Sequence, residues 1–179
     1  MLRYLDVQNI LDKNDLILQE SGCVGSENER GNTYMKKIGI VTDSHSSISQ
    51  EEAEKLGIFV LPMPFYIDGE CYYESVTLSR ELFFEKLAAG ADITTSQPSP
   101  TAVMEIWDKA LEQFEKILYM PISSGLSGSY ETAMMLAKDE AYEGRVLVVD
   151  DGQVAAPLHQ MVLDTLDMIK KGYEAEQIR

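Results

Sequence analysis

Four short apolar segments, separated by stretches with helical periodicity, constrain the fold of this chain more than any other feature. They lie at residues 38–41, 58–61, 116–122 and 145–150. Strands that alternate with helices predict an α/β domain of three layers with a mainly parallel sheet. The strongest helical pattern repeats at i, i+3, i+4, i+7 along one face, and its apolar residues are Val103, Ile106, Trp107, Ala110, Leu111 and Phe114.

Short polar signals predict where the helices begin. Ser49 and Glu52 have the spacing of a capping box, and Gly57 is well placed to end the helix that follows. Ser99 precedes Pro100, the usual order of an N-cap and a first helical residue. Further helices are predicted after 79, from about 130, and over about 154–171, where a proline at 157 is expected to distort the helix.

Turn chemistry between the second apolar segment and the helix after 79 predicts a hairpin. Asp68 and Gly69 form the dipeptide typical of a tight two-residue turn, and they lie between the sequences FYI and ECYY. The neighbouring Tyr66, Tyr72 and Tyr73 are interpreted as packing residues of this hairpin.

The first thirty-four residues differ in character from the rest. Apolar side chains in 2–17 hint at a short amphipathic helix, and SGCVGSENERGNT after it has the composition of a linker. We interpret 1–34 as an appended segment and linker. Residues 35–153 then form the α/β domain, and 154–179 form a helix that leads towards a further domain.

Charge and composition exclude several classes of protein. Thirty acidic and fifteen basic residues give a net charge of −15, which argues against a nucleic-acid partner. No run reaches the roughly 18 apolar residues of a membrane helix, so an integral membrane protein is not expected. Cys23 and Cys71 have no metal or redox spacing, and the N-terminus lacks the pattern of a secretory signal. We therefore expect a cytoplasmic protein without a metal or cofactor.

Three hydroxyl-rich loops are expected at strand ends: 42–47, 94–99 and 123–129. The second and third lead into helices, whose free N–H groups favour anions. Gly125 and Gly128 allow close backbone approach to a ligand. Serine and glycine also serve as ordinary turn and cap residues, but three such loops together predict a site for a carboxylate or phosphate. Asp43 and Ser44 are expected to shape the first loop.

The residue patterns of known catalytic and metal sites fit this sequence less well. Ser127, Asp150 and His159 follow the chain order of a hydrolase triad, but the glycine spacing around Ser127 does not match a nucleophile elbow. Asp43 lacks the sequence context of a phosphate-accepting aspartate. His45 has no evident partners for a metal site. A small hydrolase or phosphatase that uses Ser127 or Asp43 remains an alternative.

Several blocks together resemble the DegV family of bacterial fatty-acid-binding proteins. They are IGIVTDSHSSIS, GIFVLPMPFYIDGECYYE, TTSQPSP, PISSGLSGSYETA and RVLVVDD, and their order and spacing match from Met35 to about Lys171. The resemblance implies a non-enzymatic protein that holds one long-chain fatty acid and presents its carboxylate to a separate ATP-dependent fatty acid kinase, as a step towards phospholipid synthesis.

The resemblance also implies which residues hold the carboxylate. The family threonine maps to Thr95 and the family serine to Ser127, with Ser96, Ser124 and the backbone around Gly125 and Gly128 as the next candidates. Family members continue into a second domain that supplies a histidine and an arginine. This sequence departs from the pattern in its length, in DDGQVAAPLHQM after the fourth strand, and in its N-terminal segment. A truncated remnant that binds no lipid is therefore a further alternative.

Overall fold

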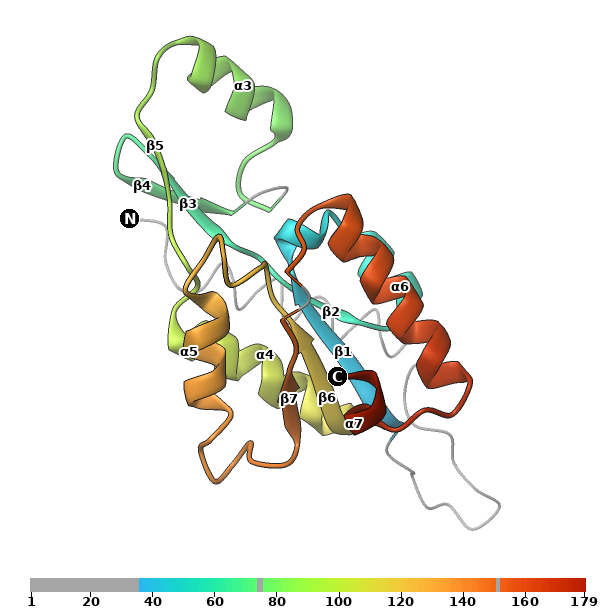
Figure 1. Ribbon diagram of the computed structural model, residues 1–179. Coiled ribbons are helices and arrows are strands. Elements are labelled where there is room, and N and C mark those ends of the chain that lie inside the picture. The colour runs from blue at the N-terminus through green and yellow to red at the C-terminus, as the bar shows by residue number, and fades with distance from the viewer. Residues whose placement is uncertain (1–35, 74–75, 151) are drawn as a thin grey trace.

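The computed structural model describes residues 36–73, 76–150 and 152–179 (Figure 1). The predicted N-terminal segment, with its apolar residues and Cys23, lies outside these residues. Among the described helices, none combines the length and the apolar content needed to cross a bilayer.

A four-stranded parallel sheet forms the centre of the fold, as the spacing of the apolar segments predicts. Its order is β2-β1-β6-β7, with every neighbouring pair parallel. The strands are β1 (Lys36–Asp43), β2 (Phe59–Leu61), β6 (Phe114–Met120) and β7 (Val146–Val148). All four predicted strands are confirmed, although β6 begins and ends two residues before the predicted 116–122 and β7 is shorter than the predicted 145–150.

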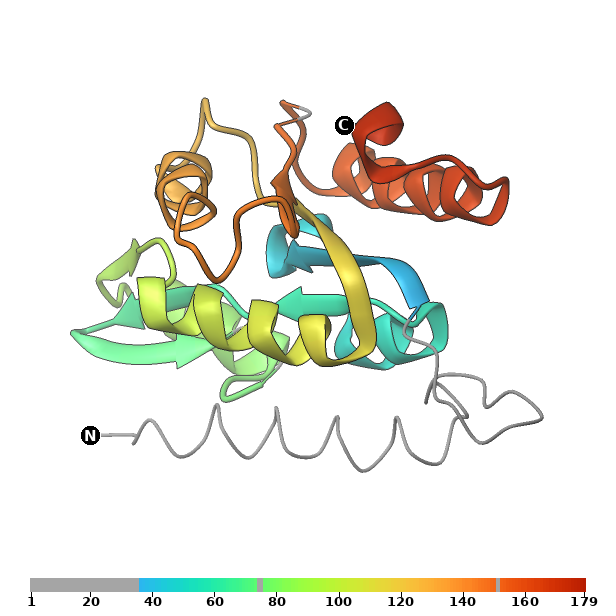
Figure 2. The same cartoon turned by 90° about the horizontal axis from the view of Figure 1, so that it is seen from below.

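Helices cover both faces of this sheet and complete the three predicted layers (Figures 1 and 2). One face packs against α4 (Pro100–Gln113) and α5 (Ser129–Leu136), and Trp107 is fully buried there. The opposite face packs against α2, α6 and α7, which cover Gln50–Leu56, Ala156–Lys170 and Ala175–Ile178. The strands are thus buried on both sides, as parallel strands usually are.

A second, antiparallel sheet lies beyond one end of the parallel sheet, with α3 (Arg80–Ala88) above it (Figure 1). Its order is β4-β3-β5, and its strands are β3 (Pro64–Ile67), β4 (Glu70–Tyr73) and β5 (Ile93–Thr95). The predicted hairpin is confirmed, because Asp68 and Gly69 have φ of 50° and 83° between β3 and β4 and the two-residue turn that joins such strands needs two positive φ angles.

The loop expected at 94–99 is partly wrong. Thr94 and Thr95 belong to strand β5, which pairs with β3 and not with the parallel sheet. Only the last part of the segment connects to α4. The three hydroxyl-rich segments therefore do not follow three strands of one sheet.

The predicted helix starts are confirmed. The side chains of Ser49, Ser79 and Ser99 each accept a hydrogen bond from the backbone N–H three residues later, which satisfies a donor that the first helical turn leaves unpaired. The structure differs from the predicted helices at two residues.

Phe114 lies at the end of the apolar face predicted for α4, but its backbone is extended and it is the first residue of β6. Pro157 lies in the first turn of α6, where proline is tolerated, so the expected distortion is wrong.

Gly39 is required where β1 passes the ring of Phe114. A Cβ at this position would lie 2.6 Å from the Phe114 ring carbons. We expect Gly39→Ala to lower the free energy of unfolding by about 1–3 kcal/mol, the usual cost of overpacking a core, measured by urea denaturation. In a Phe114→Leu background the same change should cost clearly less. An equal cost in both backgrounds would show that this contact does not exclude a side chain.

Candidate ligand-binding site

The order in which strands are added to the parallel sheet reverses between β1 and β6. From β1 the chain adds β2 on one side, and β6 then returns to the other side of β1. In open α/β sheets, ligands bind beyond the carboxyl ends of the strands at such a point. The segments that leave these two strands are the 3-10 helix η1 (Ser44–Ser46) and the loop 121–128 before α5.

Asp43 joins these two segments. Its side chain is fully buried, and its Oδ1 accepts a hydrogen bond from the backbone N–H of His45 at 2.9 Å. Its Oδ2 accepts one from the backbone N–H of Ile122 at 2.7 Å. Burial and the negative charge of Asp43 together raise the pKa of Tyr119 well above its usual range, so that hydroxyl stays protonated.

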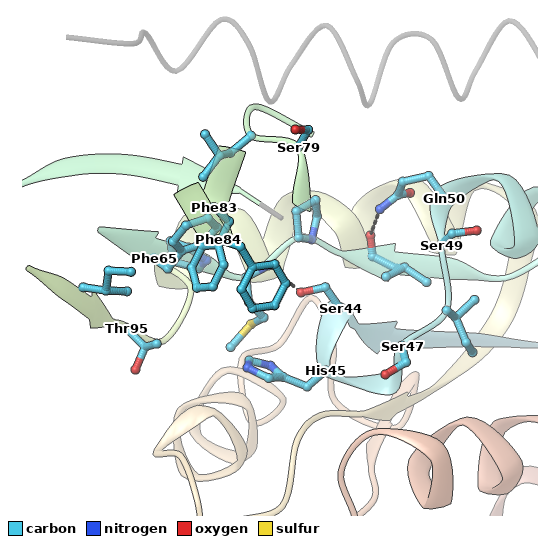
Figure 3. Close-up of a pocket in the computed structure, with 17 residues that line it drawn as sticks. Ser44, His45, Ser47, Ser49, Gln50, Phe65, Ser79, Phe83, Phe84 and Thr95 are labelled. Atoms are coloured by element: carbon cyan, nitrogen blue, oxygen red, sulfur yellow. Dashed lines mark hydrogen bonds between the residues drawn. The ribbon is translucent and has the colours of Figure 1, made fainter. Parts of the chain in front are cut away.

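A cavity of about 580 Å³ lies between the two sheets, beside η1 (Figure 3). This volume is within the range of pockets that hold small organic ligands. Its walls come from η1 and the residues that follow it up to the start of α2, from the segment 60–65, from α3 with residues 78–79, and from β5. The lining residues are Ser44, His45, Ser47, Ile48, Ser49, Gln50, Val60, Pro62, Met63, Pro64, Phe65, Leu78, Ser79, Phe83, Phe84, Ile93 and Thr95.

Two of the hydroxyls in this lining, those of Ser44 and Thr95, lie at its two ends in the sequence and can donate to a ligand. Ser44 Oγ accepts a hydrogen bond from the backbone N–H of Met63 at 3.2 Å. Thr95 is exposed and lies opposite Phe65 in the β3–β5 ladder. Neither hydroxyl donates to an acceptor among the residues that the structure describes. Both protons are therefore available to an oxygen of a ligand.

Aromatic side chains form an apolar wall of the same cavity. The rings of Phe65 and Phe83 meet edge to face with centroids 5.6 Å apart, and Phe83 and Phe84 do so at 5.5 Å. Figure 3 shows these three side chains gathered on one side, with Ser44 and His45 at the end of β1. The cavity thus combines hydroxyls with an extended apolar wall, which suits an amphipathic ligand.

The predicted loop at 123–129 lies close to the segment after β5, but its residues do not line this cavity. A Cβ on Gly128 would lie 2.9 Å from Gln97 Oε1, and Gln97 Nε2 donates to Thr132 Oγ1 at 3.3 Å. Ser127 Oγ lies 2.8 Å from Ser129 Oγ and also accepts from the Ser129 backbone N–H. The loop 123–129 and the segment that carries Thr95 and Ser96 are therefore neighbours.

Ser124 turns towards the end of β7. A hydrogen bond from the Ser124 side chain, with backbone N–H groups of Ser124 and Gly152, lowers the pKa of Asp150 against the opposing effect of burial. The backbone N–H of Gly125 donates to Ser123 Oγ at 3.2 Å. The assignment of Ser96, Ser124, Ser127 and the backbone at Gly125 and Gly128 to an anion stays a prediction.

The geometry does not assemble the alternative hydrolase triad. His159 Nε2 lies 3.1 Å from Glu52 Oε1, on the face covered by α2 and α6, while Ser127 bonds within its own loop. Asp43 is fully buried with both oxygens occupied by backbone N–H groups. Within the described residues, no group of three or more His, Cys, Asp or Glu side chains is placed to hold a metal ion.

Sequence reasoning missed His45 and the phenylalanine wall. His45 lacks the partners of a metal ligand, but its place directly after Ser44, in a loop at a strand end, is itself a signal for a ligand site. Phe83 and Phe84 follow the N-cap of α3, and no local pattern links them to β1.

Comparisons with known proteins give a consistent result. The model of the DegV family, described as "Uncharacterised protein, DegV family", matches residues 37–179. A DegV domain-containing protein of Caldanaerobacter subterraneus is 34% identical over 144 residues, which are 80% of this chain and 51% of that protein.

Two solved structures are similar in fold as well as sequence. A DegV family protein from Thermus thermophilus, described by its fatty acid binding, has a TM-score of 0.72 and 32% identity over 79% of this chain and 50% of its own. A stearic acid-binding protein from Eubacterium ventriosum has a TM-score of 0.68 and 25% identity over 80% and 50%. The chain spans about half the length of the curated relatives and solved chains that it matches.

Proposed function

Because this chain belongs to the DegV family, we propose that it binds a long-chain fatty acid and presents the carboxylate to a separate, ATP-dependent fatty acid kinase. The observation that carries the proposal is the cavity that joins hydroxyl donors at Ser44 and Thr95 to the wall of Phe65, Phe83 and Phe84. The binding of fatty acid by the solved relatives from Thermus thermophilus and Eubacterium ventriosum supports it.

The two parts of the ligand would be held by different forces. Each buried CH₂ group contributes roughly 0.8 kcal/mol, so an acyl chain along the phenylalanine wall supplies most of the gross affinity. Hydrogen bonds from hydroxyls to a carboxylate are charge-assisted and directional, so they fix the orientation of the head group.

We assign the carboxylate to Thr95 and Ser127, with Ser96, Ser124 and the backbone at Gly125 and Gly128 as further donors. The contact of Gln97 with Gly128 supports this assignment, because it brings the two segments together. The exposure of Thr95 supports presentation to a kinase, since a head group held there remains within reach of a second protein.

The purified chain is expected to carry about one fatty acid, detected by native mass spectrometry and by organic extraction. Thr95→Ala should weaken the binding of stearate by about tenfold or more, the loss expected for one charge-assisted hydrogen bond. The double variant with Ser127→Ala should retain none after purification. Thr94→Ala is the matched control, because Thr94 precedes Thr95 in β5 but does not line the cavity.

Two results would count against the proposal. Unchanged lipid occupancy in the double variant would remove the assignment of the carboxylate, while a well-folded chain without lipid would favour the non-binding alternative. The kinase step has its own assay: a stearate-loaded chain, a bacterial fatty acid kinase and ATP should yield acyl phosphate. Turnover of ester or phosphate substrates by the chain alone would instead favour a hydrolase or phosphatase.

A further inference from the structure

His45 is the only ionisable side chain among the residues that line the cavity in the described part of the chain. All the others that line it are neutral hydroxyl, amide or apolar residues. The whole chain has a net charge of −15, so its surroundings repel an anion unless a local group compensates. An imidazole at this position is therefore the one lining group that can bring a positive charge to a ligand.

Two hydrogen bonds hold the backbone of His45, and one side chain lies beside its ring. The backbone N–H of His45 donates to Asp43 Oδ1 at 2.9 Å, and its carbonyl accepts from the backbone N–H of Ala155 at 2.7 Å. The ring atom Nδ1 lies 3.4 Å from Asp43 Oδ1. A carboxylate beside Nδ1 favours a proton on that nitrogen and stabilises the imidazolium. Nε2 lies on the far edge of the ring from this contact.

We propose that His45, held by Asp43, is the residue that recognises the charge of the bound head group and so selects fatty acid anions over neutral lipids of the same chain length. The inference rests on the proposed function and deepens it, because it names which chemical class of lipid the cavity accepts. Asp43 is then a positioning residue, which acts on the ligand only through His45.

The direction of the pH dependence follows from the charges around the ring. Asp43 on β1 faces His45, and the nearby helices α2 and α6 contribute the Glu52–His159 pair. Imidazole ordinarily titrates near pH 6.5. Asp43 and a bound carboxylate both favour the protonated ring, so binding should be tightest at acidic pH and should weaken as the pH rises above this ordinary range.

The test compares His45→Gln with wild type in equilibrium dialysis against radiolabelled palmitate and, separately, hexadecanol, at pH 6.0 and pH 8.5. Removal of one charge-assisted hydrogen bond should weaken palmitate binding about tenfold to a hundredfold at pH 6.0, and much less at pH 8.5. Hexadecanol affinity should not change. His159→Gln is the matched control, because it removes the other histidine of the chain and leaves the cavity lining intact.

The outcomes separate this inference from the proposed function. A wild-type chain that binds neither ligand would defeat both. A wild-type chain that binds palmitate while His45→Gln binds it equally well at pH 6.0 would overturn the role of His45 alone. A second measurement uses only wild-type protein: palmitate should raise the titration midpoint of the His45 imidazole in proton NMR. An unmoved midpoint in a palmitate-loaded chain would also overturn the inference.

Discussion

Replacing Asp43 with alanine is expected to lower the free energy of unfolding by about 3–5 kcal/mol, among the largest effects for any single side chain of this protein. The carboxylate is fully buried and accepts from the backbone N–H groups of His45 and Ile122. A hydrogen bond to a charged group is worth about 1.5–3 kcal/mol, and a buried donor that loses its acceptor adds a desolvation cost. Urea denaturation measures the effect.

Asp150→Ala provides the matched control. Asp150 also follows a strand of the parallel sheet and accepts from the backbone N–H groups of Ser124 and Gly152, but it is exposed. Its removal should cost less than about 1 kcal/mol, because water can replace a partner at an exposed site. Equal losses in the two variants would mean that burial of Asp43 contributes nothing. Asp43→Asn, which keeps one acceptor oxygen, should fall between them.

Trp107→Ala is expected to cost about 3–5 kcal/mol, the range for removal of a large buried aromatic side chain. Trp107 is fully buried under the parallel sheet, and its ring meets Tyr119 at 5.3 Å and Tyr142 at 5.2 Å between centroids. The packing of α4 on the sheet depends on this contact. Thermal or urea unfolding of the purified variant measures the loss.

An exposed aromatic residue supplies the comparison for Trp107. Tyr173 keeps 45% of its surface exposed, so Tyr173→Ala should change the free energy of unfolding by less than about 0.5 kcal/mol. A loss below about 1.5 kcal/mol for Trp107→Ala would indicate that the neighbouring side chains close the space. In that case Tyr119 and Tyr142, not Trp107, would hold α4 against the sheet.

The parallel sheet and the helix boundaries could be predicted because their signals are local. Ser49, Ser99 and Gly57 act within one helical turn, and the Asp68–Gly69 turn is determined by its own two residues. Strand β5 could not be predicted in this way. Its residues Ile93–Thr95 are strand only because β3, nearly thirty residues earlier, offers an antiparallel partner.

The candidate site was predicted in part, for the same reason. The family resemblance predicts a role for the hydroxyl of Thr95, and Thr95 lies in the cavity lining. The ring of Phe83 reaches the cavity from α3, and His45 reaches it from the end of β1, so their meeting depends on tertiary structure. The relation of His45 to Asp43 depends on the 3-10 turn that contains His45 and that Asp43 caps.

The pairing of β1 with β6 has a consequence for synthesis of the protein in the cell. Thr42 pairs with Met120 and Ile40 with Leu118, so each contact waits until a long intervening segment has been made. At ribosomal rates of about 5–20 residues per second, β1 spends roughly 4–16 seconds without its central neighbour. During that interval an apolar strand edge is open to other nascent chains. Expression yield should therefore depend on chaperone supply more steeply than the stability of the finished fold would suggest.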